Sequence, residues 1–255
     1  MIKKLSVGKL YPFALAEGEG VGTAYEYLAK RLVLSSWLKE GVKPKKVLIA
    51  GLPQKYGCSL DFALLADEVG AELTVIDERP EALEKFERSL EAIRAQGQLT
   101  ALSWESRVTA DLSNLAADED RFDLALSSEV LQRLDDSARG KYLNEVQLVA
   151  SRVAVFCPNA ENPAHTNLSG LSGITKEELA ETAGEEAFRT GFIDMPPFPP
   201  GLTRTDEQRE QATTGRLEAM AMVVLGAYVR LERFIPARIR RQQSHIVFAL
   251  SRLAS

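Results

Sequence analysis

The sequence is poor in cysteine and histidine, and this shortage limits the chemistry that the chain can carry. Its 255 residues include two cysteines, Cys58 and Cys157, and two histidines, His165 and His245. Two isolated cysteines supply neither a disulfide framework nor a thiolate zinc site, so we expect a reducing, cytoplasmic environment. No Ser-His-Asp order and no metal-ligand spacing occurs, so histidine-based proton transfer has only two possible carriers.

Long hydrophobic runs and an excess of positive charge are also missing. The most apolar stretch, LEAMAMVVLGAYV, is too short to span a bilayer, and Gly8, Lys9 and Pro12 interrupt the apolar part of the first twenty residues. Lysine and arginine number 31 against 36 acidic residues, a net charge of −5. We therefore expect a soluble cytoplasmic protein that has no signal peptide and does not bind nucleic acid through general phosphate neutralisation.

Along residues 23–160, segments whose apolar residues follow the period of a strand alternate with segments whose apolar residues follow the period of a helix. Thr23 and Glu26 form a predicted capping box at the start of a helix that extends to about residue 40. A second predicted helix begins at Pro80 and ends near Gly97. A third predicted helix occupies residues 136–150. Short buried strands are predicted at 46–51, 72–77, 106–111, 122–128 and 152–159. This order predicts an α/β fold with a parallel sheet and helices on both of its faces.

The pattern changes after Asn159. Residues 161–173 resemble a loop, Thr175 and Glu178 cap a short helix, and the proline-rich stretch 194–202 predicts a turn. A longer helix is predicted at about 207–231 and a closing strand at 244–250. We divide the chain, a single domain overall, into a helical cap segment (1–44), a Rossmann-like core (45–160) and a C-terminal part that completes the sheet (161–255).

Polar residues and glycines gather where the predicted parallel strands end. The first strand ends at Gly51, the second at Asp77, a third turn carries Asp111, and the fourth strand continues into SSEVLQRLDD. Open α/β sheets bind ligands at the carboxyl ends of their strands, and a carboxylate there accepts two hydrogen bonds from a ribose. Structural roles remain open for these acids: Asp77 as a strand end, Asp111 as a turn former and Glu129 as a first-turn helix acid.

These motifs, in this order, resemble the small-molecule branch of the class I S-adenosylmethionine-dependent methyltransferases. The resemblance implies a doubly wound, mostly parallel seven-stranded sheet with an antiparallel final strand, and S-adenosyl-L-methionine as cofactor. It places the methionine end along Gly51 and Leu52, the ribose at Asp77 and the adenine beside Asp111. The full set of implied cofactor contacts is Tyr25, Gly51, Leu52, Gly57, Asp77, Glu78, Asp111, Leu112, Ser127 and Ser128, and the implied catalytic residues are His165 and Glu129.

The first turn departs from the pattern of that family. The usual form is GxGxG after a strand that often carries an acid, whereas this chain has Ile49 and Ala50 before GLPQKYG. Two interpretations follow: the longer loop bulges around the cofactor with Gly51 and Gly57 as pivots, or the domain is a catalytically silent binding or scaffold protein. An NAD(P)-dependent oxidoreductase is a third hypothesis, although its turn also requires closely spaced glycines.

The acceptor site is predicted from segments outside the sheet. Met195, Phe198, Met220 and Met222 favour a small, hydrophobic or lipid-like acceptor, although each also suits an ordinary core position. Residues 230–241 carry five arginines among apolar residues, a pattern that fits contact with an anionic membrane, an acidic acceptor or neighbouring acids. His245 is predicted to be a core residue and Asp123 a structural one. The oligomeric state stays open.

Overall fold

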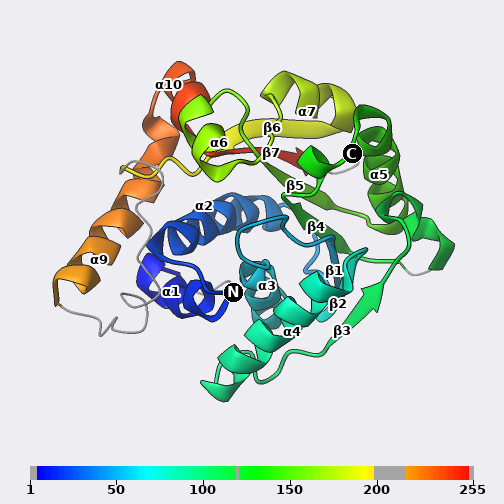
Figure 1. Ribbon diagram of the computed structural model, residues 1–255, viewed down its shortest axis with the longest axis horizontal. Coiled ribbons are helices and arrows are strands. Elements are labelled where there is room, and N and C mark those ends of the chain that lie inside the picture. The colour runs from blue at the N-terminus through cyan, green and yellow to red at the C-terminus, as the bar shows by residue number, and fades with distance from the viewer. Residues whose placement is uncertain (1–4, 119–120, 198–215, 253–255) are drawn as a thin grey trace.

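A seven-stranded mixed sheet forms the centre of the protein (Figure 1). The computed structural model describes residues 5–118, 121–197 and 216–252. The strand order is β3-β2-β1-β4-β5-β7-β6, with β1 to β5 parallel and β7 antiparallel to both β5 and β6. The strands are β1 Lys46–Ala50, β2 Glu72–Asp77, β3 Trp104–Val108, β4 Leu124–Ser128, β5 Val153–Pro158, β6 Phe188–Ile193 and β7 Ile246–Ser251. The predicted fold is confirmed.

Helices cover both faces of this sheet (Figure 1). One face carries α1 Val7–Ala16, α2 Val21–Leu38, α3 Leu60–Val69 and α4 Pro80–Ala95, and the other carries α5 Asp136–Val149 and α7 Lys176–Ala183. The side chains of β1 alternate between them: Val47 and Ile49 join the core of the first face, and Leu48 and Ala50 that of the second. This alternation follows from the two-residue period of a strand that is buried on both sides.

The C-terminal part adds, among the described residues, four more helical elements near β6 and β7. They are α6 Pro163–Ser169, α9 Arg216–Leu231, a 3-10 turn η3 Glu232–Phe234 and α10 Ala237–Gln243. Helix α9 lies beside α1 and α2 (Figure 1). Its Met222 and Val229 belong to the core of the first face. No helix in the described ranges has both the length and the apolar character that crossing a bilayer would require.

Several local predictions are confirmed. Thr175 and Glu178 form a complete capping box at the start of α7. Pro80 is the first residue of α4, as expected for a residue that has no backbone N–H to leave unpaired. Asp123 has the predicted structural role, since its carboxylate accepts hydrogen bonds from the backbone amides of Lys45 and Lys46 at 2.7 and 3.0 Å and so ties β4 to β1.

Other local predictions are wrong. Helix α2 begins at Val21 after Gly20, without a side-chain cap, so Thr23 lies inside the helix and forms no capping box, and Glu26 pairs with Lys30. Helix α1, which had no counterpart in the sequence prediction, contains Pro12 and packs its buried face on α2. Part of the expected loop 161–173 is the helix α6.

Strand β6 had no counterpart in the sequence prediction, and β3 begins two residues before its predicted start. As an edge strand β6 has no regular alternation of apolar and polar residues. Its Gly191 leaves room for the ring of Phe248, which would lie 2.7 Å from a Cβ there. The part of the helix predicted before residue 216 lies outside the described residues.

Candidate functional site

The topological switch point of the sheet lies between β1 and β4, and the turn after β1 opens onto it. Gly51 has φ +83 and its amide donates to the Ile76 carbonyl at 2.7 Å. A Cβ at Gly51 would lie 2.8 Å from Val130 Cγ2 and 3.0 Å from Leu112 Cδ1, so only glycine fits. Gln54 and Lys55 are exposed. The turn nevertheless stays at the switch point, because the backbone of Lys55 hydrogen-bonds to the Glu129 carboxylate after β4 and the Lys55 ammonium group donates to the Ser169 carbonyl.

The far end of the turn is held by the N-terminal segment. Gly57 also has a positive φ, +68, and a Cβ there would lie 2.5 Å from Glu17 Oε2. Glu17 accepts hydrogen bonds from the Leu60 amide at 2.7 Å and from the Tyr27 hydroxyl. The predicted pivot Gly57 is thus packed against a buried carboxylate of the segment after α1.

Asp77, the predicted ribose contact, is buried and fully engaged. Its Oδ2 accepts from the Leu52 amide at 2.6 Å and from Arg133 at 3.2 Å, and its Oδ1 accepts from Arg79 Nε at 2.8 Å. Burial by itself would raise the pKa of Asp77, but the hydrogen bonds from Arg79 and Leu52 and the charge of Arg133 outweigh it and lower the pKa. In this conformation both oxygens of the Asp77 carboxylate accept from the two arginines and the turn.

The predicted adenine contacts lie next to this ion pair. Leu112 is fully buried, and its amide donates to Glu78 Oε1 at 3.3 Å. Asp111 is exposed, and its carboxylate accepts from the amide and the hydroxyl of Ser113 at 2.7 and 2.8 Å. The structure therefore brings Gly51, Leu52, Asp77, Glu78 and Leu112 to one edge, whereas the Asp111 carboxylate closes its own turn.

A buried charged cluster lies at the end of β4. Lys30 is 1% exposed; its Nζ donates to the Ser128 hydroxyl at 2.8 Å and lies 2.5 Å from Glu26. The same ammonium group lies 5.4 Å from the centroid of the Phe62 ring and 5.7 Å from that of Phe156. This environment of aromatic rings keeps a charged lysine inside the core through cation–π contacts and an ion pair.

Glu129 belongs to the same cluster and is strained and incompletely paired. It is a non-glycine residue with φ +56, and its amide donates to the Phe156 carbonyl at 2.9 Å. Its buried Oε2 has no hydrogen-bond partner among the described residues. Burial, followed by repulsion from Glu26, raises the pKa of Glu129 to about 8. A buried carboxylate oxygen without a donor is a feature that a bound ligand would satisfy.

The two serines predicted with Glu129 have intramolecular partners. Ser128 accepts the hydrogen bond from Lys30, and Ser127 accepts one at 2.7 Å from the hydroxyl of Tyr142. That hydroxyl also contacts the carbonyl oxygen of Ala50, the last residue of β1, at 2.5 Å. Both serines therefore hold β4 against its neighbours at the switch point.

The two histidines, which the sequence separates by eighty positions, lie against each other. Their rings stack with centroids 4.0 Å apart and an interplanar angle of 10°. His245 Nδ1 lies 3.2 Å from Asp194 Oδ2; burial by itself would lower the pKa of His245, but Asp194 outweighs it and raises the pKa. Burial, with repulsion from His245, lowers the pKa of His165 to about 4.

Sequence reasoning missed Asp194 and treated His245 as an ordinary core residue. Asp194 sits at the end of β6 with φ +63, and it is buried at 4% exposure. The positive φ suits the Asp-Met-Pro-Pro turn, but nothing local in that turn indicates a partner fifty positions away. Glu26 acts electrostatically on both Glu129 and His245, so the histidine pair and the β4 cluster share one charged interior.

Tyr25, one of the implied cofactor contacts, connects α2 to the C-terminal part. Its ring is fully buried and its hydroxyl donates to Glu232 of η3. Glu232 also accepts from the Met195 amide at 2.8 Å, and burial raises the pKa of Glu232 to about 7. The tyrosine thus holds the segment that follows β6.

The residues predicted to frame an acceptor have different positions. Met195 and Met222 are buried, whereas Met220 is 64% exposed on α9. Phe198 lies outside the described residues. Arg241 pairs with Glu161 and Glu177, as expected for a solvated helix end with neighbouring acids.

Comparison with known proteins supports the fold assignment. No family model and no curated protein sequence matches the chain. Among solved structures, the methyltransferase domain of bacterial CtHen1 superposes with a TM-score of 0.52 at 16% identity, covering 88% of this chain and 98% of that one. Magnesium protoporphyrin IX methyltransferase from Synechocystis PCC 6803, with bound SAH, gives 0.50 at 13% identity, covering 90% and 85%. The chain therefore has the class I S-adenosylmethionine-dependent methyltransferase fold.

Proposed function

We propose that this protein is an S-adenosylmethionine-dependent methyltransferase that acts on a small organic acceptor. The observation that carries the proposal is the buried Glu129 carboxylate, whose Oε2 has no partner among the described residues, at the edge of the sheet where this fold binds ligands. A buried acceptor oxygen is costly when it is unpaired. With a pKa of about 8 this carboxyl group is largely protonated near neutral pH, and the ammonium group of a methionine moiety would be a donor to it and would favour its charged form.

In the present conformation the residues at the switch point suit the methionine end of the cofactor better than its ribose end. Gly51, Leu52 and Glu129 would hold the methionine end, and Asp77 with Leu112 would hold the adenosine. The ribose end fits only after Arg79 and Arg133 release the Asp77 carboxylate, because both now donate to it. When bound, the cofactor supplies a methyl group on a sulfonium leaving group.

His165 would orient the methyl acceptor. A pKa of about 4 keeps His165 neutral at neutral pH, and its buried Nδ1 has no hydrogen-bond partner in the described part of the chain. An imidazole with so low a pKa is a weak base, so its main role would be to accept a hydrogen bond from the O–H or N–H group of the methyl acceptor. His245, paired with Asp194, holds the first ring by stacking. The remaining contribution of the protein is alignment of the reactants and exclusion of water.

A second function, a catalytically silent binding or scaffold protein, is favoured by the state of the ribose site. Arg79 Nη2 donates to the Leu52 carbonyl at 2.8 Å as well as to Asp77, so one guanidinium group locks the turn to β2. Val130 and Leu112 fill the space above Gly51. If this arrangement persists in solution, the cofactor cannot reach Asp77.

Calorimetric titration with S-adenosylhomocysteine separates the two. The enzyme hypothesis predicts binding to the wild type, loss of binding in Asp77→Ala, and binding about tenfold tighter in Arg133→Ala, where a competitor for the carboxylate is removed. Asp136→Asn, an exposed acid at the start of α5, is the matched control and should bind as the wild type does. Absence of both heat and a thermal shift in the wild type and in Arg133→Ala would refute the enzyme hypothesis. A parallel titration with NADH tests the oxidoreductase hypothesis.

A further inference from the structure

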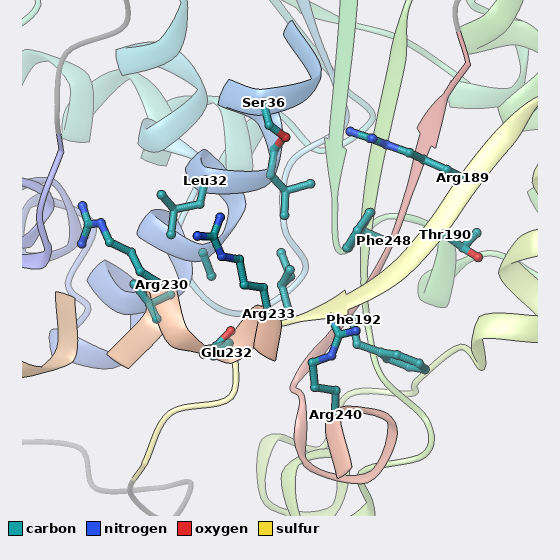
Figure 2. A pocket seen from close by; sticks show the side chains of 14 residues that line it. Leu32, Ser36, Arg189, Thr190, Phe192, Arg230, Glu232, Arg233, Arg240 and Phe248 are labelled. Carbon is teal, nitrogen blue, oxygen red and sulfur yellow. The ribbon is translucent and has the colours of Figure 1, made fainter. Parts of the chain in front are cut away.

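A separate cavity lies over the edge strand, between α2, β6 and the end of α9 (Figure 2). Its volume is about 580 Å³, within the range typical of small-molecule sites. Much of its wall is apolar, formed by Leu32 and Val33 of α2, Phe192 of β6, Val229 of α9 and Phe248 of β7. None of these residues is among the predicted cofactor or acceptor contacts.

Four arginines stand around this apolar wall: Arg189, Arg230, Arg233 and Arg240 (Figure 2). Two of them have partners, because Arg230 donates to the Leu5 carbonyl at 2.8 Å and Arg189 lies 3.7 Å from Glu40. Within the described ranges, no carboxylate pairs with Arg233 or Arg240, and the buried Nε of Arg240 has no hydrogen-bond partner. The Arg233 guanidinium group lies 4.7 Å from the centroid of the exposed Phe234 ring, a stacking contact that does not use its N–H groups, so both Arg233 and Arg240 can still donate to an anion.

The acid in the cavity wall does not neutralise these arginines. Glu232 is 6% exposed, and its carboxylate is already engaged by the Tyr25 hydroxyl and the Met195 amide. Burial raises its pKa to about 7, which reduces its negative charge near neutral pH. The electrostatic field in the cavity is consequently positive.

We propose that this cavity binds a small amphiphilic anion, a single apolar chain or ring system that ends in a carboxylate or phosphate. The apolar wall would bury the body of the ligand, and Arg233 and Arg240 would take the anionic group, since the planar guanidinium fork matches carboxylate and phosphate oxygens. This site stands independently of methyl transfer, because it needs neither the cofactor nor the residues at the switch point.

The test is calorimetric titration of the full chain, without cofactor, with decanoate and with decyl phosphate. Decanol has the apolar chain without the anionic group, and inorganic phosphate has the anionic group without the chain. Each should bind at least about tenfold more weakly than the amphiphiles. The double variant Arg233→Gln/Arg240→Gln should lose about tenfold or more in affinity for both amphiphiles. Arg238→Gln, at an exposed α10 arginine that does not line the cavity, is the matched control and should bind normally.

A second variant tests the cavity without changing its charge. Ser36 is exposed and lines the cavity from α2, so Ser36→Trp should fill the space and reduce binding while thermal unfolding stays near that of the wild type. Binding that survives both this variant and the arginine pair would overturn the proposal. So would binding only to phosphatidylglycerol vesicles and not to either monomeric amphiphile, which would indicate a surface contact. A failed titration with S-adenosylhomocysteine would leave this result unchanged.

Discussion

Replacing Glu17 with glutamine should remove a large pH-dependent part of the stability of this protein. Glu17 follows α1, is 4% exposed, and accepts hydrogen bonds from the Leu60 amide and the Tyr27 hydroxyl beside the turn after β1. Burial raises its pKa from 4.5 to about 7, because the hydrogen bonds that favour the charged form do not offset the loss of water. Glutamine keeps the shape and the acceptor oxygen of this side chain without its titration.

The direction and size of the effect follow from that shift. A group with a raised folded-state pKa holds its proton more tightly in the folded chain, so its contribution is complete below pH 4.5 and is lost as the pH rises through 7. At about 1.4 kcal/mol per pKa unit, the full loss is about 3 kcal/mol. Between about pH 5 and about pH 8 the linkage relation gives a loss of about 2.5 kcal/mol.

Urea unfolding across that pH interval measures the effect. The free energy of unfolding of the wild type should fall relative to that of Glu17→Gln by about 2.5 kcal/mol from about pH 5 to about pH 8. Glu84→Gln is the control, because that side chain is 67% exposed on α4 and its variant should keep the wild-type pH dependence. If the curves of the wild type and Glu17→Gln run parallel, Glu17 is not a buried, protonated carboxyl and the reasoning fails.

Three further predictions concern other parts of the site and fold. Lys30→Met should destabilise the protein by about 3 kcal/mol in urea unfolding, because Glu26 loses its ion-pair partner, and adding Glu26→Gln should recover part of the loss; no recovery would argue against the pair. In the wild type the lowered pKa of His165 makes the free energy of unfolding fall as the pH drops from about 6.5 towards 4, and His165→Asn should reduce that fall. An equal fall in the wild type and the variant would contradict this. Thr175→Ala should cost about 1 kcal/mol through loss of its helix cap, and an unchanged urea midpoint would contradict that role.

The parallel core of the sheet was predictable because its signals are local. Residues 46–50, 72–77 and 153–158 are short apolar runs bounded by polar turns, and a strand buried on both faces requires such a run wherever it lies in the sheet. Pro80 and Thr175 mark helix starts through their own backbone and side-chain chemistry. These elements follow from a few adjacent residues each.

The edge elements were less predictable. Strand β6 carries Arg189 and Gly191, which suit a sheet edge but obscure the two-residue pattern. Helix α1 contains Pro12 and forms because its apolar face packs on α2 and α9. In both places tertiary packing outweighs local propensity, which single-sequence patterns do not capture.

In the candidate site, too, the positions of some residues were predictable from the sequence, whereas their side-chain contacts were not. Gly51, Asp77 and Leu112 could be placed at one edge of the sheet from sequence, because the ends of parallel strands must meet there. No sequence pattern indicated that Arg79 and Arg133 donate to the Asp77 carboxylate, since side-chain pairing depends on which rotamers meet in the folded chain.

By itself, then, the sequence determined which segments form the strands of the parallel core and the edge at which polar groups collect, because both follow from hydrophobic period and chain direction. Only the tertiary structure decided the contacts between distant residues: Asp194 with His245, Glu17 with the first turn, and the arginines around the cavity beside β6. Those contacts join elements that folding brings together from far along the chain, and their burial sets their chemistry.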